Sequence, residues 1–464
     1  MEHTKRYFFC GIGGSGMLPL AFIMRARGAQ VWGSDRSRDQ GQLDSKFAWL
    51  ESIGVRLFPQ DGSGLESADQ ILVTSTAIEA TVPDVARALD LGCPRQLRAE
   101  LNAALLNAAT TRIGVGGTSG KSTVTGMIGW ILHSAGHALT VMNGAVMRNF
   151  SHGVTNPYAS ALADGTDSYV SEVDESDGSI AFYNPSVAVI TNISLDHKSL
   201  AELQQLFGDF AARSPHAIVN ADDDESAPLW AGNTTFGFAD EADVQAVDFT
   251  PRADGSDFAV LVDGQRHAAS LAMPGRHNVA NALAAIAATS AAGVPVAQAV
   301  AALASFAGLA RRYEVVGTAT VAGGGTITVI DDFAHNPDKV AATLAAIATL
   351  PGRALLFFQP HGYGPLRQMG AELAASFASG MRTDDQLFVS DPVYNGGTVD
   401  RSVGSAEFVA DIQRHGANAQ HIPLRRDCAT AIIAQAQAGD RILVLGARDD
   451  TLTDFAHGLL ADLA

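Results

Sequence analysis

Residues 114–123, with the sequence GVGGTSGKST, combine glycines, hydroxyl side chains and one lysine in the pattern of a phosphate-binding loop. Small residues let backbone N–H groups converge on an anion, and the helix predicted after the loop directs its positive end at the same point. Lys121 is expected to reach the terminal phosphates of a nucleotide, and Ser122 or Thr123 to bind Mg²⁺. The alternative is a plain strand-to-helix turn with one exposed lysine. The residues predicted to bind nucleotide are Gly117, Thr118, Ser119, Gly120, Lys121, Ser122 and Thr123.

A metal site is predicted beside this loop, because an acidic segment follows another expected strand. The segment EVDESD offers four carboxylates, which belong to Glu172, Asp174, Glu175 and Asp177. Glu172 is the first candidate ligand for Mg²⁺, with Ser122 from the loop and His197 from the segment NISLDHKS. The alternative for the acidic segment is a solvated loop, and a single histidine is more often a structural side chain than a ligand.

A second glycine motif, GIGGSG, lies close to the N-terminus. Gly11, Gly13 and Gly16 have the G-x-G-x-x-G spacing of a dinucleotide-binding turn, so the motif alone predicts an NAD-type site. Asp35 follows the next predicted strand, where an acidic residue commonly binds a ribose hydroxyl.

The elements that must position these residues alternate between strands and helices. Residues 7–10, 18–27 and 29–35 predict a strand, a helix and a strand, which is a βαβ unit. Residues 258–273 predict a β-hairpin, and residues 275–293 predict a helix closed by glycine. Ligands of open α/β sheets bind beyond the carboxyl ends of the strands, so the polar segments that follow the strands are expected along one rim.

The length of 464 residues suffices for about three domains of roughly 150 residues each. The predicted fold class is α/β, with domains at 1–109, 110–309 and 310–464. The central domain is expected to hold the nucleotide loop. One continuous sheet across these boundaries would contradict the division.

Composition excludes several other classes of protein. The net charge is −18, which argues against nucleic acid as a partner. No apolar run reaches the ~18 residues of a membrane span, and no signal peptide is recognised, so a cytoplasmic protein without a membrane partner is expected. Cys10, Cys93 and Cys428 are far apart, which indicates neither a disulfide framework nor a zinc site.

Seven motifs occur in the order seen in the Mur ligases, and the resemblance covers essentially the whole chain. The motifs are GIGGSGM, GGTSGKST, EVDESDGS, TNISLDH, GRHNVANALAA, RRYE and DDFAHNPDKV. The resemblance implies a three-domain architecture, with a Rossmann-like UDP-sugar domain, a central P-loop ATPase-like domain and a C-terminal Rossmann-like domain. The glycine motif would then bind the pyrophosphate of a UDP-sugar rather than NAD.

The resemblance also implies a reaction. ATP phosphorylates a substrate carboxylate, and the amine of an amino acid attacks the acyl phosphate to form an amide. The motifs are most similar to the branch that adds L-alanine to UDP-N-acetylmuramate in peptidoglycan precursor synthesis. The alternative is a Mur-type ligase for another carboxylate or peptide in recycling or specialised metabolism. ATP and Mg²⁺ are the expected cofactors, and a monomer or weak homodimer is the expected assembly.

Roles for single residues are implied by the same resemblance. Asn278 and Asn281 would contact the adenine region, with His277 nearby, and Arg312 would reach the γ-phosphate. Asp331 or Asp332 would hold the ribose, and His335 and Arg367 would bind the incoming amino acid. The implied catalytic residues are Lys121, Glu172, His197, Arg312 and His335. The implied donor-binding residues are Gly13, Gly14, Ser15, Gly16, Asp35 and Ser75.

Simpler structural explanations exist for several of these residues. His277 could be a polar cap at a helix N-terminus. Arg311 and Arg312 could be a solvated linker pair, and Arg367 could be a solvated residue at the start of a helix.

The chain departs from the family pattern at the acceptor end. Asn336 stands where the alanine-adding branch has a second histidine, and Gly362 replaces an arginine in FQPHGYGPLR. The segment after His197 is shorter, and no lysine occurs between Lys198 and Lys339 that could be carbamoylated, as in many members. ATP and the amide bond are therefore firmer expectations than the identity of the amino acid.

Two hypotheses from other functional classes are disfavoured by residues of the chain. A non-catalytic nucleotide-binding relative would be expected to have lost Lys121, Ser122, Glu172 or His197, all of which are present. An NAD-dependent oxidoreductase would leave the loop from Gly117 to Thr123 unexplained.

Overall fold

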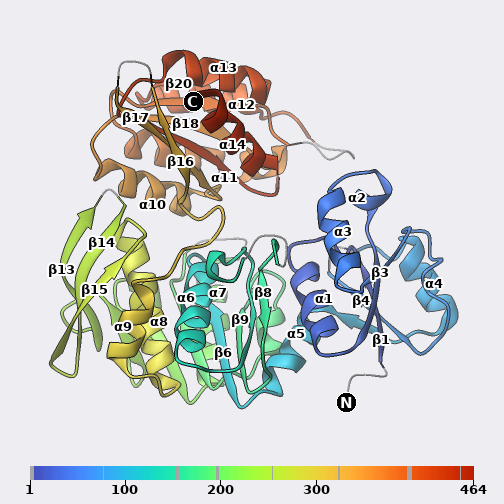
Figure 1. Ribbon diagram of the computed structural model, residues 1–464. Coiled ribbons are helices and arrows are strands. Elements are labelled where there is room, and N and C mark those ends of the chain that lie inside the picture. Colours follow the sequence, from blue (N-terminus) through green and yellow to red (C-terminus); the bar gives the residue numbers. More distant parts are fainter. Residues whose placement is uncertain are drawn as a thin grey trace. The chain divides into compact units, whose positions relative to one another are not determined.

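The computed structural model describes residues 5–76, 78–151, 156–194, 198–252, 254–321, 324–393, 400–449 and 451–463. These residues form three sheets with flanking helices (Figure 1). The α/β fold class is therefore confirmed.

The first sheet has five parallel strands in the order β3-β2-β1-β4-β5. This order is that of the first five strands of a doubly wound nucleotide-binding fold. Its strands are β1 (Arg6–Cys10), β2 (Gln30–Ser34), β3 (Arg56–Phe58), β4 (Gln70–Thr74) and β5 (Arg95–Leu97). Its helices are α1 (Met17–Ala26), α2 (Arg36–Asp39), α3 (Asp44–Ser52), α4 (Pro83–Leu91) and α5 (Arg98–Asn107). The βαβ unit predicted at the N-terminus is thus present.

The second sheet has ten strands in the order β15-β14-β13-β12-β11-β10-β6-β9-β7-β8. Its strands are β6 (Thr111–Gly116), β7 (Leu139–Met142), β8 (Ala161–Ala163), β9 (Ser168–Glu172), β10 (Val187–Ile190), β11 (His216–Asn220), β12 (Thr234–Gly237), β13 (Val244–Arg252), β14 (Gly255–Val262) and β15 (Gln265–Leu271). Its helical segments are α6 (Lys121–Ser134), η1 (Arg148–Phe150), η2 (Ser179–Phe182), α7 (Leu200–Ala212), η3 (Asp224–Leu229), α8 (Arg276–Ala291) and α9 (Val296–Leu303).

Strand β6 pairs in parallel with β9 on one side and with β10 on the other. The carboxyl ends of these three strands therefore share one edge of the sheet, as expected for the polar segments that follow them. The predicted hairpin is also present: Asp263 and Gly264 connect β14 to β15 with positive φ angles of 49° and 73°. Two residues of positive φ make the tight turn that suits the twist of antiparallel strands.

The third sheet has six strands in the order β16-β17-β21-β18-β19-β20. Strands β16 and β17 are antiparallel, and the other pairs are parallel. Its strands are β16 (Glu314–Thr320), β17 (Thr326–Asp332), β18 (Ala354–Gln359), β19 (Gln386–Val389), β20 (Ala419–His421) and β21 (Arg441–Gly446). Its helices are α10 (Pro337–Ala348), α11 (Tyr363–Gly380), α12 (Ser405–Arg414), α13 (Arg425–Gln435) and α14 (Thr451–Leu463).

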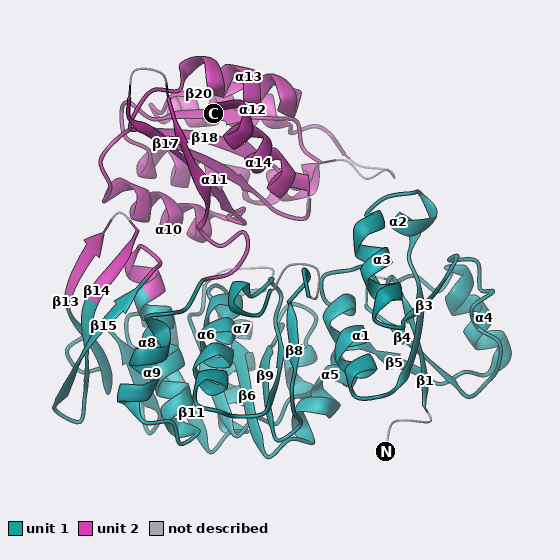
Figure 2. Ribbon diagram, viewed as in Figure 1, with its two compact units in different colours: residues 1–248, 258–271, 279–307 teal, residues 249–257, 272–278, 308–464 magenta. Residues whose placement is uncertain are grey.

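The chain divides into two compact units (Figure 2). Unit 1 comprises residues 1–248, 258–271 and 279–307, and unit 2 comprises residues 249–257, 272–278 and 308–464. Unit 1 contains the first sheet and the strands around β6. The three-domain boundaries at 109/110 and 309/310 remain a prediction.

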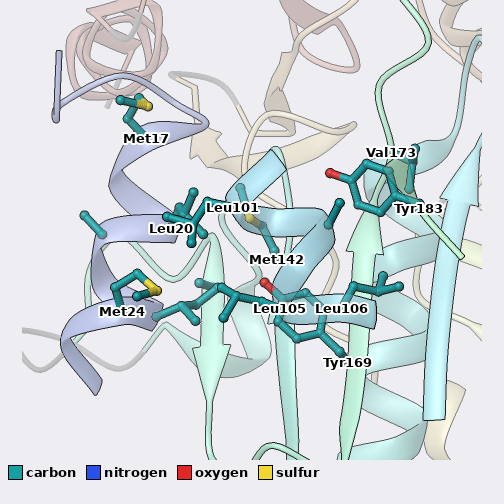
Figure 3. Packing of buried hydrophobic residues seen from close by; sticks show 14 of the residues in the cluster. Met17, Leu20, Met24, Leu101, Leu105, Leu106, Met142, Tyr169, Val173 and Tyr183 are labelled. Atoms are coloured by element: carbon teal, nitrogen blue, oxygen red, sulfur yellow. The ribbon is translucent and has the colours of Figure 1, made fainter. Parts of the chain in front are cut away.

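Within unit 1, helix α5 joins the first sheet to the second (Figure 3). Leu101, Leu105 and Leu106 of α5 are buried in one core cluster with Leu20 of α1 and Tyr169 of β9. Burial of a leucine side chain stabilises a fold by about 1.5–3 kcal/mol. This shared core therefore fixes α5 against β9 inside unit 1.

Two further features concern the whole described chain. Cys10 and Cys428 are buried, Cys93 is half-buried, and all three are free thiols. None of the helices in the described ranges is both long enough and apolar enough to cross a bilayer.

Candidate active site

The predicted phosphate-binding loop lies between β6 and α6, in unit 1. Gly117 and Gly120 have φ angles of 125° and 85°, a region that side chains disfavour. A Cβ atom on Gly117 would also collide with Thr191 at the end of β10. The backbone N–H of Ser119 donates to the side-chain oxygen of Asn192 at 2.9 Å, and the Thr191 hydroxyl donates to the Ser119 carbonyl at 2.6 Å. Strand β10 therefore fixes the shape of the loop.

Lys121 is the first residue of α6, and its ammonium group is largely buried. It lies 2.9 Å from a carboxylate oxygen of Glu175 and donates to the Gly117 carbonyl at 2.5 Å. Burial lowers the pKa of Lys121, but the carboxylates of Glu175 and Glu172 outweigh this effect and hold its pKa above the ordinary value. A permanent positive charge is therefore held at the N-terminus of α6.

Ser122 and Glu172 are brought together as the predicted pair of metal ligands. The Ser122 hydroxyl donates to Glu172 Oε2 at 2.8 Å, and the same oxygen accepts from the Gly144 N–H at 3.0 Å. Oxygen atoms of this kind suit Mg²⁺, which usually completes its coordination with water and substrate phosphates. The third predicted ligand, His197, lies outside the described residues. In the described ranges, no group of three histidine, cysteine or carboxylate side chains is arranged to hold a metal.

Further polar groups converge on the loop. The Ser119 hydroxyl is buried without a hydrogen-bond partner in the described part of the chain, as expected for a group that awaits a ligand. The side chain of Asn281, on α8, lies against Gly120, where an added Cβ would collide with its amide oxygen. Thr123 is buried on the first turn of α6. The loop thus offers a buried cation, a helix N-terminus and open hydrogen-bonding capacity to a phosphate chain.

The N-terminal glycine turn follows β1. Asp35 connects this turn to the next helix: its carboxylate accepts from the Gly13 N–H at 2.8 Å and from the Ser37 N–H at 2.8 Å. Asp35 thereby caps α2 and holds Gly13, while Gly14 and Ser15 are exposed. The sequence-based expectation placed Asp35 on a hydroxyl of the ligand, and in this structure both of its oxygens accept from the backbone.

A cavity of about 90 Å³ lies next to the turn, between the first and second sheets. Ser75 lines it, together with Arg98, Asp177 and Phe182, and its role in donor binding remains a prediction. The Arg98 guanidinium lies so close to Gly16 that an added Cβ would collide with it. No hydrogen-bond acceptor contacts the Arg98 side chain within the ranges that the structure describes. The cavity therefore presents one cation, Arg98, and one carboxylate, Asp177.

Sequence reasoning did not select Arg98, and it assigned no role to Glu175. Arg98 starts α5 in a segment without glycine, so no short motif marks it. Glu175 was one of four acidic candidates, and its distinguishing property is burial, with 4% of its surface exposed. Its pKa is raised by burial, although the Lys121 ammonium opposes that shift. Only the folded arrangement identifies the partner of Lys121.

In unit 2, Arg311 and Asp331 form a buried ion pair. Arg311 Nε lies 3.2 Å from the Asp331 carboxylate, and the guanidinium also donates to the carbonyls of Gly446 and Asp449 at 2.8 and 3.0 Å. The Thr453 hydroxyl donates to Asp331 at 3.0 Å. Asp331 is completely buried, so in this structure it has a structural role, and its ribose contact remains a prediction.

Arg312 and Asp332 directly follow Arg311 and Asp331 in the sequence. The Arg312 guanidinium lies 4.7 Å from the ring centroid of Phe333. Asp332 accepts backbone N–H groups of Tyr313 and Ala334, both at 2.7 Å. Burial raises the pKa of Asp332 to about 6, against the opposing charge of Arg312. The contacts of Arg311 and Arg312 thus differ from those of the solvated linker pair that was the alternative, and the role of Arg312 at the γ-phosphate remains a prediction.

His335 lies beside His361, a residue for which sequence reasoning proposed no role. Their ring centroids are 4.9 Å apart with the planes at 82°. His335 Nδ1 lies 2.7 Å from the Phe333 carbonyl oxygen, which accepts a hydrogen bond from the Nδ1–H group. In this neutral tautomer Nε2 keeps its lone pair. Burial, together with the charge of Lys339, lowers the pKa of His335 well below its ordinary value. His335 is therefore neutral at physiological pH.

The remaining predicted residues are also ordered. The Asn278 side chain donates to the Pro274 carbonyl at 2.7 Å, and His277 occupies the first turn of α8. Arg367 is about half exposed near the start of α11, 3.1 Å from the Asp400 carboxylate. Gly362 has a φ angle of 148°, so the turn before α11 favours glycine.

Comparisons with known proteins give matches along nearly the whole chain. Three family models match: the Mur ligase catalytic domain over residues 6–110, the Mur ligase middle domain over 115–289 and the Mur ligase glutamate ligase domain over 311–448. The chain belongs to the Mur ligase family, and it is an ATP-dependent ligase. This membership excludes the oxidoreductase.

Individual relatives agree with the family models. The chain is 34% identical to UDP-N-acetylmuramate–L-alanine ligase of Novosphingobium aromaticivorans, over 98% of this chain and 96% of that protein. It is 31% identical to the ligase of the same name from Streptomyces griseus, over 99% and 97%.

Solved structures resemble the chain as well. Its fold matches that of UDP-N-acetylmuramate–alanine ligase from Thermotoga maritima with a TM-score of 0.80, at 24% identity and over 98% of both chains. A murein peptide ligase from Psychrobacter arcticus matches with a TM-score of 0.69, at 26% identity, over 99% of this chain and 98% of that one.

Proposed function

We propose that this ligase joins L-alanine to the carboxylate of UDP-N-acetylmuramate, with ATP cleaved to ADP and phosphate, as a step of peptidoglycan precursor synthesis. The observation that carries the proposal is similarity of 31–34% over nearly the whole chain to proteins named for that reaction. ATP and the UDP-sugar donor are cytoplasmic metabolites, so we place the reaction in the cytoplasm.

The nucleotide half of the reaction uses the loop of unit 1. Backbone N–H groups and Lys121 hold the phosphate chain of ATP, and the Lys121 charge offsets negative charge as the γ-phosphoryl group moves to the donor carboxylate. Ser122 and Glu172 would hold Mg²⁺, which supplies charge neutralisation to the phosphates when bound. Asn281 lies beside the loop and fits a contact to the nucleotide.

The donor half uses the cavity beside the N-terminal glycine turn. Two anionic groups, the donor carboxylate and the γ-phosphate, must meet for the acyl phosphate to form. Arg98 and the backbone of residues 13–16 provide the positive potential that holds the donor. Ser75 supplies a hydroxyl to the same cavity.

The acceptor half uses the polar side chains of unit 2. The amine of an amino acid is protonated in water and must lose a proton before it attacks an acyl phosphate. His335 is neutral with a free lone pair on Nε2, so it is suited to accept that proton. Arg367 is the candidate partner of the amino acid carboxylate, in exchange for Asp400.

A second candidate function is ligation of a short peptide rather than L-alanine. Gly362 removes an arginine from the turn before α11, and the remaining Arg367 is paired with Asp400. This acceptor region therefore has fewer cationic side chains than the alanine-adding branch. The similarity to a murein peptide ligase at 26% identity also supports this alternative.

A phosphate-release screen tests both candidates. The purified chain is incubated with ATP, Mg²⁺ and UDP-N-acetylmuramate, and each amino acid or a murein tripeptide is added in turn. We expect L-alanine to give the fastest release. UDP-N-acetylglucosamine is the matched control donor, because it lacks the lactyl carboxylate. Turnover only with the tripeptide would replace L-alanine as acceptor, and turnover with a different carboxylate alone would overturn the proposed donor.

A further inference from the structure

Helix α5 begins at the donor cavity and packs against β9, the strand that ends at the candidate metal ligand Glu172. Arg98, its first residue, lines the cavity, and Asn102 lies on the same face of the helix one turn later. Asn102 has 3% of its surface exposed, although it is polar. A buried amide of this kind must be hydrogen-bonded, and its partners show what the helix is attached to.

Two of the three partners of Asn102 lie on β9 of the second sheet, and the third, Tyr183, directly follows η2. Its Nδ2 donates to the Ser171 hydroxyl and to the Tyr183 hydroxyl, both at 2.9 Å. Its Oδ1 accepts the Tyr169 hydroxyl at 2.7 Å. Ser171 and Tyr169 belong to β9, the strand that ends at Glu172. The amide thus joins α5 directly to the strand that carries the candidate metal carboxylate.

The neighbouring bonds fix the orientation of the amide. The Ser171 hydroxyl donates its proton to the Glu172 carbonyl at 2.8 Å, so its oxygen is left to accept. Only the nitrogen of Asn102 can donate to it. The result is a continuous chain of hydrogen bonds from Asn102 through Ser171 to the backbone of Glu172.

Apolar packing surrounds this chain. Figure 3 shows Leu101, Leu105 and Leu106 of α5 between Met24 of α1 and Tyr169 of β9. Apolar contacts hold the helix close to the sheet, but they allow small sliding movements. The three hydrogen bonds of Asn102 are directional, and each is broken when the helix shifts by a fraction of the hydrogen-bond length. They therefore prevent this sliding.

We propose that Asn102 is a positioning residue that keeps the donor-binding Arg98 aligned with the metal-binding Glu172. The proposal rests on the proposed function, because alignment matters only if the donor carboxylate and the γ-phosphate meet between these two groups. A displacement of about 1 Å between reacting groups can cost about 10²-fold in rate. Loss of the bonds should therefore reduce kcat more than it weakens the binding of either substrate.

The test compares three variants in the phosphate-release assay, with the donor that the wild-type chain uses fastest. Asn102→Ala removes all three bonds, and Ser171→Ala removes only the link to the Glu172 backbone. Tyr169→Phe is the matched control, because it removes one bond to the same amide without touching that link. Measurements are kcat, the KM for donor, the KM for ATP and the thermal midpoint.

We expect Asn102→Ala to lower kcat by about 10- to 100-fold. Ser171→Ala should lower it in the same direction by a smaller factor. The KM for ATP should change by less than about threefold in both variants, since the loop is held by β10. Tyr169→Phe should lower the thermal midpoint but leave kcat within about threefold of the wild type, because both bonds of Asn102 Nδ2 remain, including the one to Ser171 that leads to Glu172.

Two results would overturn the proposal: a normal kcat in folded Asn102→Ala, or an equal loss of kcat in Tyr169→Phe. If Asn102→Ala does not fold, Ser171→Ala decides in the same way. A failure of the proposed function is seen separately, as absence of wild-type turnover with UDP-N-acetylmuramate. The ratio between variant and wild type is measured with whichever donor is active.

Discussion

The nucleotide loop of unit 1 and the histidine-bearing end of unit 2 are built by different means. The loop takes its shape from the backbone: two glycines at positive φ, the start of α6 and hydrogen bonds from Thr191 and Asn192. The end of unit 2 takes its shape from side chains, with Arg311 joined to Asp331 and to carbonyls of another segment. A backbone site can be recognised from a short motif, whereas a side-chain site depends on residues that are far apart in the sequence.

The two buried cations show the same contrast. Lys121 is held by the Glu175 carboxylate and one carbonyl, so an incoming phosphate can replace part of its contacts. Arg311 is held by a buried carboxylate and two carbonyls, and its guanidinium is largely buried. Lys121 is therefore poised for a ligand, and Arg311 is committed to the fold.

The largest expected effect is that of Lys121→Ala on turnover. The lysine charge stabilises the transferred phosphoryl group, so its loss should lower kcat by about 10²–10³, or about 2.7–4 kcal/mol. Phosphate release at saturating ATP measures this. Lys5→Ala, which removes an exposed lysine of the same unit, should leave kcat unchanged. Near-normal turnover of Lys121→Ala would place phosphate binding elsewhere.

Glu175→Gln should lower the stability of the nucleotide-free chain much more than that of the ATP-bound chain. It removes the main partner of a buried ammonium, and we expect the nucleotide-free chain to lose about 3–5 kcal/mol of stability. A bound triphosphate replaces the lost carboxylate, so saturating ATP should restore most of the thermal midpoint.

The control for this variant is Glu51→Gln, which breaks an exposed ion pair with Arg38. Exposed pairs contribute about 0–1 kcal/mol, so its midpoint should hardly move. If ATP does not restore the midpoint of Glu175→Gln, the carboxylate has a purely structural role.

Stability at acid pH should depend on His277 in unit 2. Burial lowers its pKa from 6.5 to about 4, so the unfolded chain binds the proton more readily in that interval. The neutral residue contributes stability above about pH 6.5, and this contribution is lost as the pH falls through about 4. Thermal midpoints from pH 7 to pH 4 should therefore fall less steeply in His277→Gln than in the wild type. Parallel curves for the two proteins would refute the assignment, and His415→Gln serves as the exposed control.

The smallest expected effect is that of Arg367→Ala on the acceptor. The side chain is half exposed and already paired with Asp400, so we expect the amino acid KM to rise by about three- to tenfold. The KM for ATP should stay constant. Arg414→Ala breaks a comparable exposed pair with Asp411 and should change neither value. An unchanged amino acid KM in Arg367→Ala would mean that this arginine is only a solvated residue at a helix start.

Local patterns were sufficient to predict much of the fold. The αβ alternation, the βαβ unit after residue 5 and the Asp-Gly hairpin were all predicted correctly, because each depends on residues close together in the chain. The short elements β3, β5, α2 and α3 are among those that were not predicted. Strand β5 has three residues and is defined by pairing with β4, and α2 depends on the cap that Asp35 provides.

The candidate site shows the same limit. The glycines, Lys121, Ser122 and Glu172 were selected from motifs, and the structure brings Ser122 and Glu172 to 2.8 Å. Arg98 and Glu175 were missed as functional side chains, because their significance lies in what they face after folding. Asp331 was selected as a ribose ligand; in this structure its carboxylate contacts Arg311, and the ribose contact remains a prediction. Sequence spacing does not show which partner each of two adjacent buried aspartates contacts in the fold.

Unit 2 consists of three separate stretches of the sequence, and this affects how the protein can be produced in fragments. Residues 249–257 and 272–278 belong to this unit but precede its main segment, 308–464. A fragment that starts at 308 therefore lacks two pieces of its own body. During synthesis on a ribosome, those pieces emerge long before their partners, and they must wait for the last segment. Separate production of the C-terminal segment, or reassembly from halves split at residue 307, would therefore divide the segments of one compact unit.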